Sequence, residues 1–369
     1  MVAELDRRSR EASRPLLVDF FSGCGGTSSG FRAAGVEIVA AIDNDPDAAA
    51  TFKRNFPRAL VLCKDVRLVE IDELRSVLEA PSRRNRPVLF SACAPCQPFS
   101  KQRRGTVATD DRADLLAELL RFVGAFRPDA LFVENVPGLE RRAADYGPFT
   151  RFVRSLRGRG YSVTYRAIES RAYGVPQVRQ RLVLLASRHG RMRFPAPTHG
   201  PGTSRPYPTV RDAIAKLPPL TAGQVHPSIS AHRAARLSEM NLSRIHATPE
   251  GGGREAWPDE FLLPCHLSRP GSYTDTYGRL RWDMPAPALT TRCISYSNGR
   301  YGHPDQDRGL SAREAACLQT FPMGFEFQGT LGSVARQIGN AVPVALAKNF
   351  ATALRCHVED GRSPARAAL

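Results

Sequence analysis

The alternation of short apolar runs with helix-length segments between residues 15 and 189 constrains the fold of this chain most strongly. Each apolar run has the length of a strand, and the segments between several of them repeat apolar residues at helical spacing. The predicted strands cover residues 16–21, 36–42, 59–62, 87–92, 129–133, 161–168 and 181–187. Strands that alternate with helices of this length indicate an α/β fold with a doubly wound, mainly parallel sheet.

The predicted helices have recognisable first and last residues. They cover residues 27–34, 46–55, a segment ending before Pro128, 311–321 and 334 to about 354. Asp110 or Asp111 caps the third of these helices, and Pro128 stops it. Ser311 and Glu314 match a capping box at the start of the fourth helix.

Polar or reactive residues follow each of the first five predicted strands. They are the turn Ser22-Gly23-Cys24-Gly25-Gly26, Asp43, Asp65, the loop from Cys93 to Gln97, and Glu134-Asn135. Open parallel sheets bind ligands at the carboxyl ends of their strands. We therefore expect a single site to collect these side chains.

The glycine turn after the first strand indicates close approach of the backbone to a ligand. A dinucleotide fingerprint would carry glycine where Ser28 stands, which counts against a nicotinamide oxidoreductase. Asp43 follows at the spacing at which an acid meets ribose hydroxyls. A nucleoside-bearing cofactor without a tightly held pyrophosphate fits better. The alternative is that the run from Asp43 to Pro46 only caps a helix.

Cys93-Ala94-Pro95-Cys96 is compatible with three kinds of chemistry. As half of a metal site it lacks a second Cys-x-x-Cys and a His-Glu-x-x-His partner in the sequence. As a redox dithiol it would be expected to open a helix, whereas Pro98 and a polar run follow it. As a single nucleophilic thiol it would be activated by the basic residues of this loop, with Glu134 supplying an acid.

The chain also carries a large excess of positive charge. Its 52 Lys and Arg residues against 36 Asp and Glu residues give a net charge of +16 and a pI near 10.0. This excess either serves solubility alone or indicates a phosphate-rich partner. The sequence shows no bilayer-length apolar run and no signal-type start, and its eight cysteines are scattered. We expect a cytoplasmic protein with reduced thiols.

Several motifs together carry a family resemblance. The central ones are Pro95-Cys96-Gln97-Pro98-Phe99-Ser100, Glu134-Asn135-Val136 and Gln177-Val178-Arg179-Gln180-Arg181. They resemble, in kind and in order, the nucleophile, acid and arginine motifs of the bacterial-type DNA (cytosine-5)-methyltransferases. Residues 19–26 resemble the opening cofactor motif of that family, and residues 313–322 and 337–343 resemble its closing motifs. The match runs from about residue 15 to 355.

The resemblance implies methyl transfer from S-adenosylmethionine to C5 of a cytosine flipped out of double-stranded DNA. Cys96 would add to C6 as a thiolate, and Glu134 would hydrogen-bond the ring. Arg179 and Arg181 would hold the base oxygen and orient Glu134. Further substrate contacts would come from Gln97, Ser100 and Asn135. The duplex buries C5 and C6, so the base must leave the stack.

The resemblance also implies a Rossmann-like, S-adenosylmethionine-dependent methyltransferase domain without a metal, which releases S-adenosylhomocysteine. The implied cofactor residues are Phe21, Gly23, Gly25, Asp43, Asn44, Asp65, Leu115, Asn340 and Val342. Phe21 and Leu115 would alternatively serve only as core residues. Asp43 stands where the family often has Glu, and Asn44 where an aromatic residue follows. Cys93 replaces a more usual glycine, and we expect it to be a bystander.

The resemblance gives the expected domain organisation. We expect a lead-in at 1–14, a catalytic domain at 15–189 and 326–356, a smaller loop-rich target-recognition domain at 190–309 with its variable part at 190–283, a hinge at 310–325 and a tail at 357–369. Candidate DNA contacts are Arg254, Trp257, His266, Arg269, Tyr273, Tyr277 and Arg279. We expect a monomer that acts on double-stranded DNA, with a cognate restriction endonuclease encoded nearby.

Three other functions were weighed against this one. A tRNA cytosine methyltransferase of similar architecture would carry a Cys-Phe-Thr element, which the sequence lacks. A catalytically silent DNA-binding paralogue is disfavoured because Cys96, Glu134, Arg179 and Arg181 are all present. A redox protein that uses Cys93 and Cys96 is disfavoured further.

Overall fold

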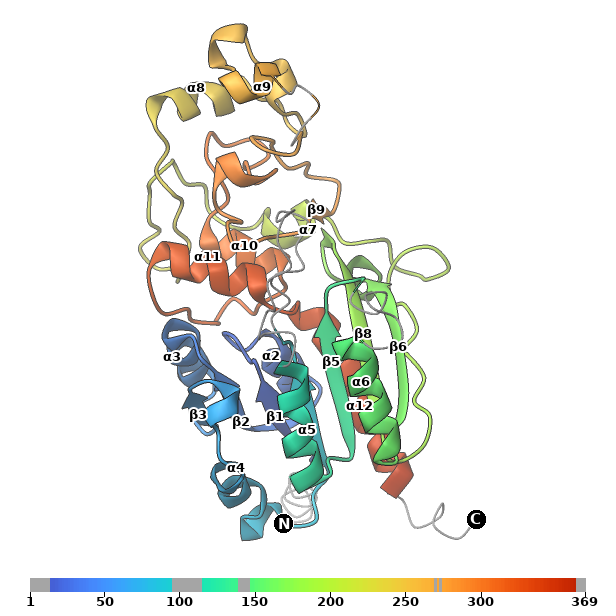
Figure 1. The fold of residues 1–369 in the computed structure, drawn as a ribbon. Helices are drawn as coiled ribbons and strands as arrows, with labels where there is room; N and C mark the ends of the chain where they lie inside the picture. The colour runs from blue at the N-terminus through green and yellow to red at the C-terminus, as the bar shows by residue number, and fades with distance from the viewer. Residues whose placement is uncertain (1–13, 95–114, 139–146, 269–270, 272–273, 363–369) are drawn as a thin grey trace, which may run out of the picture. The chain divides into compact units, whose positions relative to one another are not determined.

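The computed structural model describes residues 14–94, 115–138, 147–268, 271 and 274–362. Contacts between residues divide the chain into two compact units. Unit 1 is built from the residues up to 169, from 180–196 and from 344 onward, and unit 2 from 170–179 and 197–343. Each unit is therefore assembled from separate stretches of the chain, as the colours of Figure 1 show.

The core of unit 1 is a seven-stranded sheet with the order β3-β2-β1-β4-β5-β8-β6. Its strands are β1 Leu16–Phe20, β2 Glu37–Asp43, β3 Leu60–Cys63, β4 Val88–Ala92, β5 Ala130–Asn135, β6 Ser162–Glu169 and β8 Gln180–Ser187. The first five strands pair in parallel, and β8 runs antiparallel to both β5 and β6. The mainly parallel sheet expected from the sequence is confirmed.

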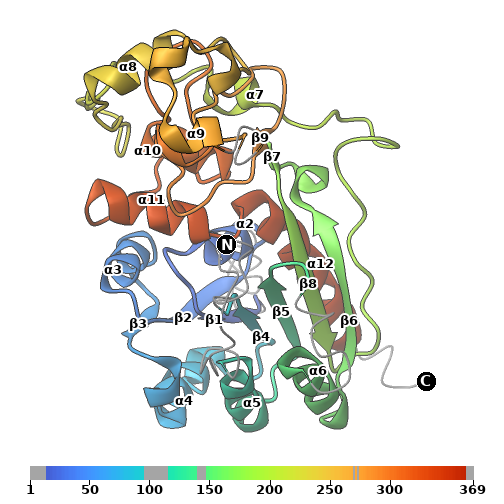
Figure 2. The same cartoon turned by 45° about the horizontal axis from the view of Figure 1, so that its top comes forward.

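Helices cover both faces of this sheet (Figure 2). They are α2 Gly26–Ala33, α3 Pro46–Asn55, α4 Ile71–Leu78, α5 Leu115–Phe126, α6 Pro148–Gly158 and α12 Val344–Arg362. Leu131 and Val133 of β5 share one apolar cluster with residues of α4, α5 and α6. Phe132 points to the opposite face, where its ring contacts Phe31 of α2 and Phe350 of α12. Successive side chains of β5 therefore pack against helices on opposite faces of the sheet.

Helix α12 packs against helix α2. A Cβ atom at Gly30 of α2 would collide with Ala347 and with the backbone of Val344 and Lys348 in α12. Glycine is thus required where the two helix backbones approach most closely. Through this contact, α12 packs with α2 on the same face of the sheet and so belongs to unit 1.

Unit 2 contains short elements held together by buried polar groups and an aromatic cluster. Its elements are β7 Gln177–Val178, β9 Ala286–Pro287, α7 Val210–Ile214, α8 Glu239–His246, α9 Pro264–Ser268, α10 Ala312–Leu318 and α11 Leu331–Asn340. Strands β7 and β9 pair in parallel. Ring contacts connect Trp257 to Tyr277 and Tyr277 to Tyr296. Thr248 accepts a hydrogen bond from the Trp257 indole at 2.8 Å.

Two features of the C-terminal region differ from the sequence prediction. The helix predicted from 334 to about 354 is two helices, because Pro343 lacks an amide donor and disfavours helical backbone in the preceding residue. The segment 326–343, expected in the catalytic domain, belongs to unit 2. There α11 packs on α10, and Gly339 lies so close to Thr290 that a Cβ atom would collide with its carbonyl.

Candidate functional site

The turn after β1 is shaped by left-handed backbone and by one carboxylate. Phe21, Gly23 and Gly25 have φ values of +55°, +51° and +98°. The Gly23 amide donates to Oδ2 of Asp43 at 2.7 Å, and the Asp45 amide donates to Oδ1 at 2.9 Å. Asp43 therefore connects the turn after β1 with the turn after β2. This brings together three of the predicted cofactor residues, Phe21, Gly23 and Asp43.

The run from Asp43 to Pro46 does cap a helix, and the residue that caps α3 is Asp45. Asp45 accepts hydrogen bonds from the amides of Asp47 and Ala48 at 3.0 and 3.3 Å. Asp43 is partly buried instead, and burial raises the pKa of its carboxyl group despite the hydrogen bonds from backbone amides. A carboxylate oxygen accepts more than one hydrogen bond, so Asp43 retains acceptor capacity for a ligand hydroxyl.

Asp19 was not singled out in the sequence, yet it lies beneath the same turn. It is the next-to-last residue of β1 and is fully buried, with hydrogen bonds from the hydroxyls of Ser28 at 2.6 Å and Ser91 at 2.7 Å. Through Ser28 it ties β1 to the first turn of α2. The available signal was a single acid inside the apolar run Leu16-Leu17-Val18-Asp19-Phe20.

The remaining predicted cofactor residues lie in different surroundings. Asn44 is exposed beside Asp43, and Leu115 is buried in the apolar cluster of unit 1. Asp65 caps a short helical turn and forms an ion pair with Arg67 at 2.7 Å, and the Arg67 hydrogen bonds lower its pKa. Asn340 and Val342 belong to unit 2. The part of these residues in cofactor binding stays a prediction.

A buried carboxylate with two partners lies at the carboxyl end of β5. Glu134 has a side chain only 4% exposed, and its Oε1 lies 2.8 Å from Nε of Arg181. The thiol of Cys93 donates to its Oε2 at 2.8 Å. The contact between Glu134 and Arg181 is the one expected from the motifs. Cys93, which was expected to be a bystander, contacts the predicted acid through its thiol.

Asn135, the last residue of β5, holds Ala94, which precedes the predicted nucleophile motif in the sequence. Its side-chain amide donates to the Ala94 carbonyl at 3.3 Å, and its Oδ1 accepts from the Val136 amide at 2.7 Å. The predicted residues Cys96, Gln97 and Ser100 lie outside the described residues. The structure therefore describes the predicted acid and the residues up to Ala94.

The two arginines of the predicted motif do not share one environment. Arg181 is the second residue of the long strand β8 in unit 1, whereas Arg179 lies between β7 and β8 and belongs to unit 2. The Arg179 guanidinium is buried and donates to the carbonyls of Leu289, Gly339 and Ala341. Among the described contacts, Arg181 pairs with Glu134, whereas Arg179 contacts backbone carbonyls of unit 2. The break in the strand separates two residues that one continuous strand would place on the same face.

Several residues nominated for DNA contact are buried in unit 2 instead. Trp257, His266 and Tyr277 form mutual ring contacts, and Trp257 is 7% exposed. Arg279 donates to the carbonyls of Ile245, Thr248, His303 and Gln306 and pairs with Asp307. Arg254 is also buried, and Arg269 and Tyr273 lie outside the described residues. The aromatic residues of this weakly periodic region therefore form a core and not a surface for contacting DNA.

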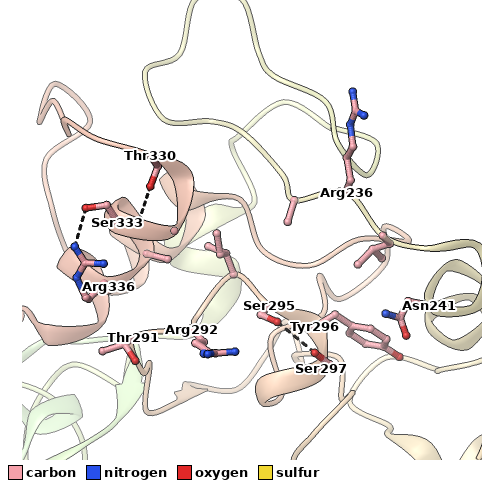
Figure 3. A pocket seen from close by; sticks show the side chains of 15 residues that line it. Arg236, Asn241, Thr291, Arg292, Ser295, Tyr296, Ser297, Thr330, Ser333 and Arg336 are labelled. Atoms are coloured by element: carbon pink, nitrogen blue, oxygen red, sulfur yellow. Dashed lines mark hydrogen bonds between the residues drawn. The ribbon is translucent and has the colours of Figure 1, made fainter. Parts of the chain in front are cut away.

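Unit 2 carries a polar groove of about 660 Å³ that the sequence did not indicate. Arg236, Arg292 and Arg336 come from three separate segments of its wall (Figure 3). All three arginines are exposed, and the described lining residues include Ser295 and Ser297 but no Asp or Glu. In a chain with 52 Lys and Arg residues, no pattern marks these three in advance.

The described residues show neither a metal-binding cluster nor a membrane-spanning helix. Within them, no cluster of three or more His, Cys, Asp or Glu side chains is arranged to hold a metal ion. No helix in the described part of the chain combines the length and the apolar character needed to cross a membrane.

Comparison with known proteins gives one consistent family. Residues 16–356 match the family model described as C-5 cytosine-specific DNA methylase. The Type II methylase M.HgiDII of Herpetosiphon aurantiacus is 39% identical over 349 residues, which covers 93% of this chain and 96% of that protein. The Type II methyltransferase M1.HphI of Haemophilus parahaemolyticus is 32% identical, covering 91% and 86% of the two chains.

Solved structures share the fold. An E. coli prophage protein described as a DNA modification methyltransferase superposes with a TM-score of 0.72 and 22% identity, covering 93% of this chain and 99% of that one. The S. pombe Dnmt2 methyltransferase superposes with a TM-score of 0.58 and 18% identity, covering 95% and 100%. At these identities the likeness concerns the fold alone.

Proposed function

The chain belongs to the C-5 cytosine-specific DNA methylase family and is a DNA (cytosine-5)-methyltransferase, and from this premise we propose its mechanism. It transfers a methyl group from S-adenosylmethionine to C5 of a cytosine flipped out of a specific double-stranded DNA sequence. Cys96 forms a covalent bond to C6 of that cytosine during the reaction.

The observation that carries this proposal is the buried Glu134 carboxylate between Arg181 and Cys93. Carbon C5 is a poor nucleophile until C6 is attacked. Addition of the Cys96 thiolate to C6 breaks the C5–C6 double bond and places electron density on C5. Glu134 in its carboxylic acid form donates its proton toward N3 and so stabilises the negative charge that the addition places on the ring, and Arg181 holds the carboxyl group in place. After methylation, loss of the C5 proton and expulsion of the Cys96 thiolate restore the double bond.

The turn after β1 fits the nucleoside cofactor, whose sulfonium supplies the methyl group. A Cβ atom at Gly23 would meet no atom within 4 Å, so the protein leaves space beside this backbone. Asp43 lies next to that space with a carboxylate that can accept from a ribose hydroxyl. Phe21, Gly25, Asn44, Asp65 and Leu115 of unit 1 complete the proposed set, together with Asn340 and Val342.

The groove of unit 2 supplies proposed contacts to the DNA backbone. Exposed arginines that line one groove, with no Asp or Glu among its described lining residues, suit phosphodiester oxygens. Arg236, Arg292 and Arg336 would therefore position the duplex without reading its sequence.

We further propose that the protein acts as a cytoplasmic monomer and is paired with a restriction endonuclease that recognises the same sequence. The relatives M.HgiDII and M1.HphI are themselves named Type II enzymes. The test is protection of methylated plasmid from an endonuclease encoded nearby, with the mass of the protein in solution measured by light scattering.

The covalent step is tested in two stages. Bisulfite sequencing of plasmid DNA from cells that express the protein first identifies the methylated cytosine. An oligonucleotide with 5-fluorocytosine at that position should then form an adduct with the wild-type protein in the presence of S-adenosylmethionine, visible as a shifted band after denaturation. Cys96→Ala should form none. Methylation without an adduct in the wild type would contradict the proposed mechanism.

A further inference from the structure

Cys93 occupies the first position after β4, next to the predicted acid on the neighbouring strand. In the parallel pairing of β4 with β5, Ala92 lies opposite Val133. Continuing this register by one residue places Cys93 beside Glu134. The Cys93 thiol donates to Oε2 of Glu134 at 2.8 Å. The contact therefore follows from the sheet register and not from a flexible loop.

The Glu134 carboxyl group is held from two sides. Oε1 is paired with Nε of Arg181, while Oε2 receives the thiol. The last torsion of a glutamate side chain has a broad energy profile, so the carboxyl plane is fixed only by external partners. Two partners on different oxygens define that plane, whereas one alone would leave rotation about its own contact.

Cys93 is itself fixed by both neighbouring strands. Its amide donates to the Phe20 carbonyl of β1 at 3.3 Å. The carbonyl of the next residue, Ala94, accepts from the Asn135 side chain of β5 at 3.3 Å. A thiol on this anchored backbone is well placed to hold Glu134 in one orientation.

We propose that Cys93 is a positioning residue that acts through Glu134. The thiol is a weak, uncharged donor, in contrast to the Arg181 guanidinium. It fixes the direction of Oε2 without adding positive charge there, so that this oxygen remains able to hold or accept a proton during catalysis. The inference rests on the proposed function, because it assumes that Glu134 acts on the cytosine ring.

The test compares two substitutions of Cys93 with a matched control. Cys93→Ala removes the donor and should lower kcat about ten- to a hundredfold while leaving the KM for DNA nearly unchanged. Cys93→Ser restores a donor and should recover most of that loss. Cys63→Ala, an exposed cysteine at the end of β3, should behave as the wild type. A kcat of Cys93→Ala within twofold of the wild type would overturn the proposal.

A double-mutant cycle separates positioning from a merely structural role. In a Glu134→Gln background, Cys93→Ala should cause no further loss of the residual rate, because the group it positions is already altered. An undiminished loss in that background would also overturn the proposal. The 5-fluorocytosine adduct should still form in Cys93→Ala. If wild-type methylation or its adduct were absent, the proposed function would fail; if only the Cys93 effects were absent, this inference alone would fail.

Discussion

Asp19 is an ionisable group near the carboxyl end of β1, with apolar neighbours on the strand and two serine hydroxyls as hydrogen-bond donors. Burial raises the pKa of its carboxyl group from 3.8 to about 6, and the hydrogen bonds from Ser28 and Ser91 offset only part of that rise. The nearby Asp43 raises it a little further. Asp19 thus makes unit 1 sensitive to pH near neutrality.

The sign of this effect follows from the direction of the shift. The pKa of Asp19 in the folded protein lies above the unfolded value of 3.8. The protonated carboxyl group therefore stabilises the fold fully below pH 3.8, and this stabilisation is lost as pH rises through about 6. We expect the free energy of unfolding of the wild type to fall by about 2 kcal/mol relative to Asp19→Asn between pH 4 and pH 7. This free energy is measured at each pH by urea unfolding, with circular dichroism as the signal.

The control for Asp19 uses the position of the tryptophans. Both, Trp257 and Trp282, lie in unit 2, so their fluorescence reports on that unit. Asp19→Asn should leave the pH dependence of the fluorescence transition unchanged. Parallel pH curves of wild type and variant by circular dichroism would show that Asp19 does not titrate as expected.

Gly23 and Gly35 form a matched pair for the proposed cofactor site. Both have positive φ, +51° and +84°, and both have no atom within 4 Å of an added Cβ. Alanine at either position should therefore cost a similar backbone strain of about 1–2 kcal/mol. Gly23 lies in the turn at the start of α2, whereas Gly35 follows its other end.

Only Gly23→Ala should weaken cofactor binding. We expect its dissociation constant for S-adenosylhomocysteine, measured by calorimetry, to rise at least about tenfold, because the methyl group fills space in which the ligand approaches the backbone. Gly35→Ala should bind within about twofold of the wild type at 25 °C. Equal effects of the two substitutions would place the ligand elsewhere.

The residues of the site differ in how far the sequence could reveal them. The contact of Glu134 with Arg181 was expected because both belong to motifs with recognised roles. The contact of Cys93 with Glu134 depends on the register of β4 against β5, which residue types alone do not specify. The different environments of Arg179 and Arg181 depend on a strand break between them. Such features arise from tertiary pairing.

At the scale of elements, the start of α10 combines a predicted cap with a buried ion pair that was not predicted. The Ser311 hydroxyl accepts from the Glu314 amide, and the Glu314 carboxylate accepts from the Ser311 amide. Arg308 is fully buried and donates to both oxygens of the same carboxylate at 2.7 Å. Burial alone would raise the pKa of Glu314, but Arg308 outweighs it and lowers the pKa.

Removing one partner of this pair should be costly. Arg308→Ala leaves a buried carboxylate without its bidentate partner, and we expect a loss of about 3–5 kcal/mol in the unfolding free energy of unit 2. Tryptophan fluorescence during urea unfolding measures this loss. The pair Arg308→Met with Glu314→Gln removes both charges and keeps a side chain that can cap α10, so it should recover most of the loss. A single variant no less stable than the double one would contradict this account.

Elements with strong local signals were predicted well, and those fixed by long-range contacts were not. The seven strands of unit 1 and the cap of α10 were visible in apolar runs and capping residues. The pairing of β7 with β9 joins distant parts of the sequence, and α8 and α9 lie where periodicity is weak. The region of α8 and α9 is stabilised by Trp257, Arg279 and other buried groups from distant positions in the sequence. From local composition alone, these residues were predicted to form an exposed DNA-contacting surface, whereas they form a core.

At the scale of the whole molecule, the net charge of +16 has two competing explanations. If it acts as a diffuse field, any removed arginine weakens DNA binding similarly. If it acts through specific phosphate contacts, only arginines at the interface matter, and each released counterion steepens the salt dependence. The groove of unit 2 separates these explanations because it gathers Arg236, Arg292 and Arg336 in one place.

A comparison of two triple variants decides between them. Arg→Gln at Arg236, Arg292 and Arg336 should reduce the slope of log K against log salt by about 0.9 for each lost phosphate contact. Arg→Gln at Arg84, Arg127 and Arg159 removes the same charge from exposed positions that precede β4, β5 and β6, at the edge of the sheet opposite Glu134. That control should leave the slope unchanged. Equal slopes for the two variants would assign the charge to a diffuse field, and the groove would then lose its proposed role in holding the DNA backbone.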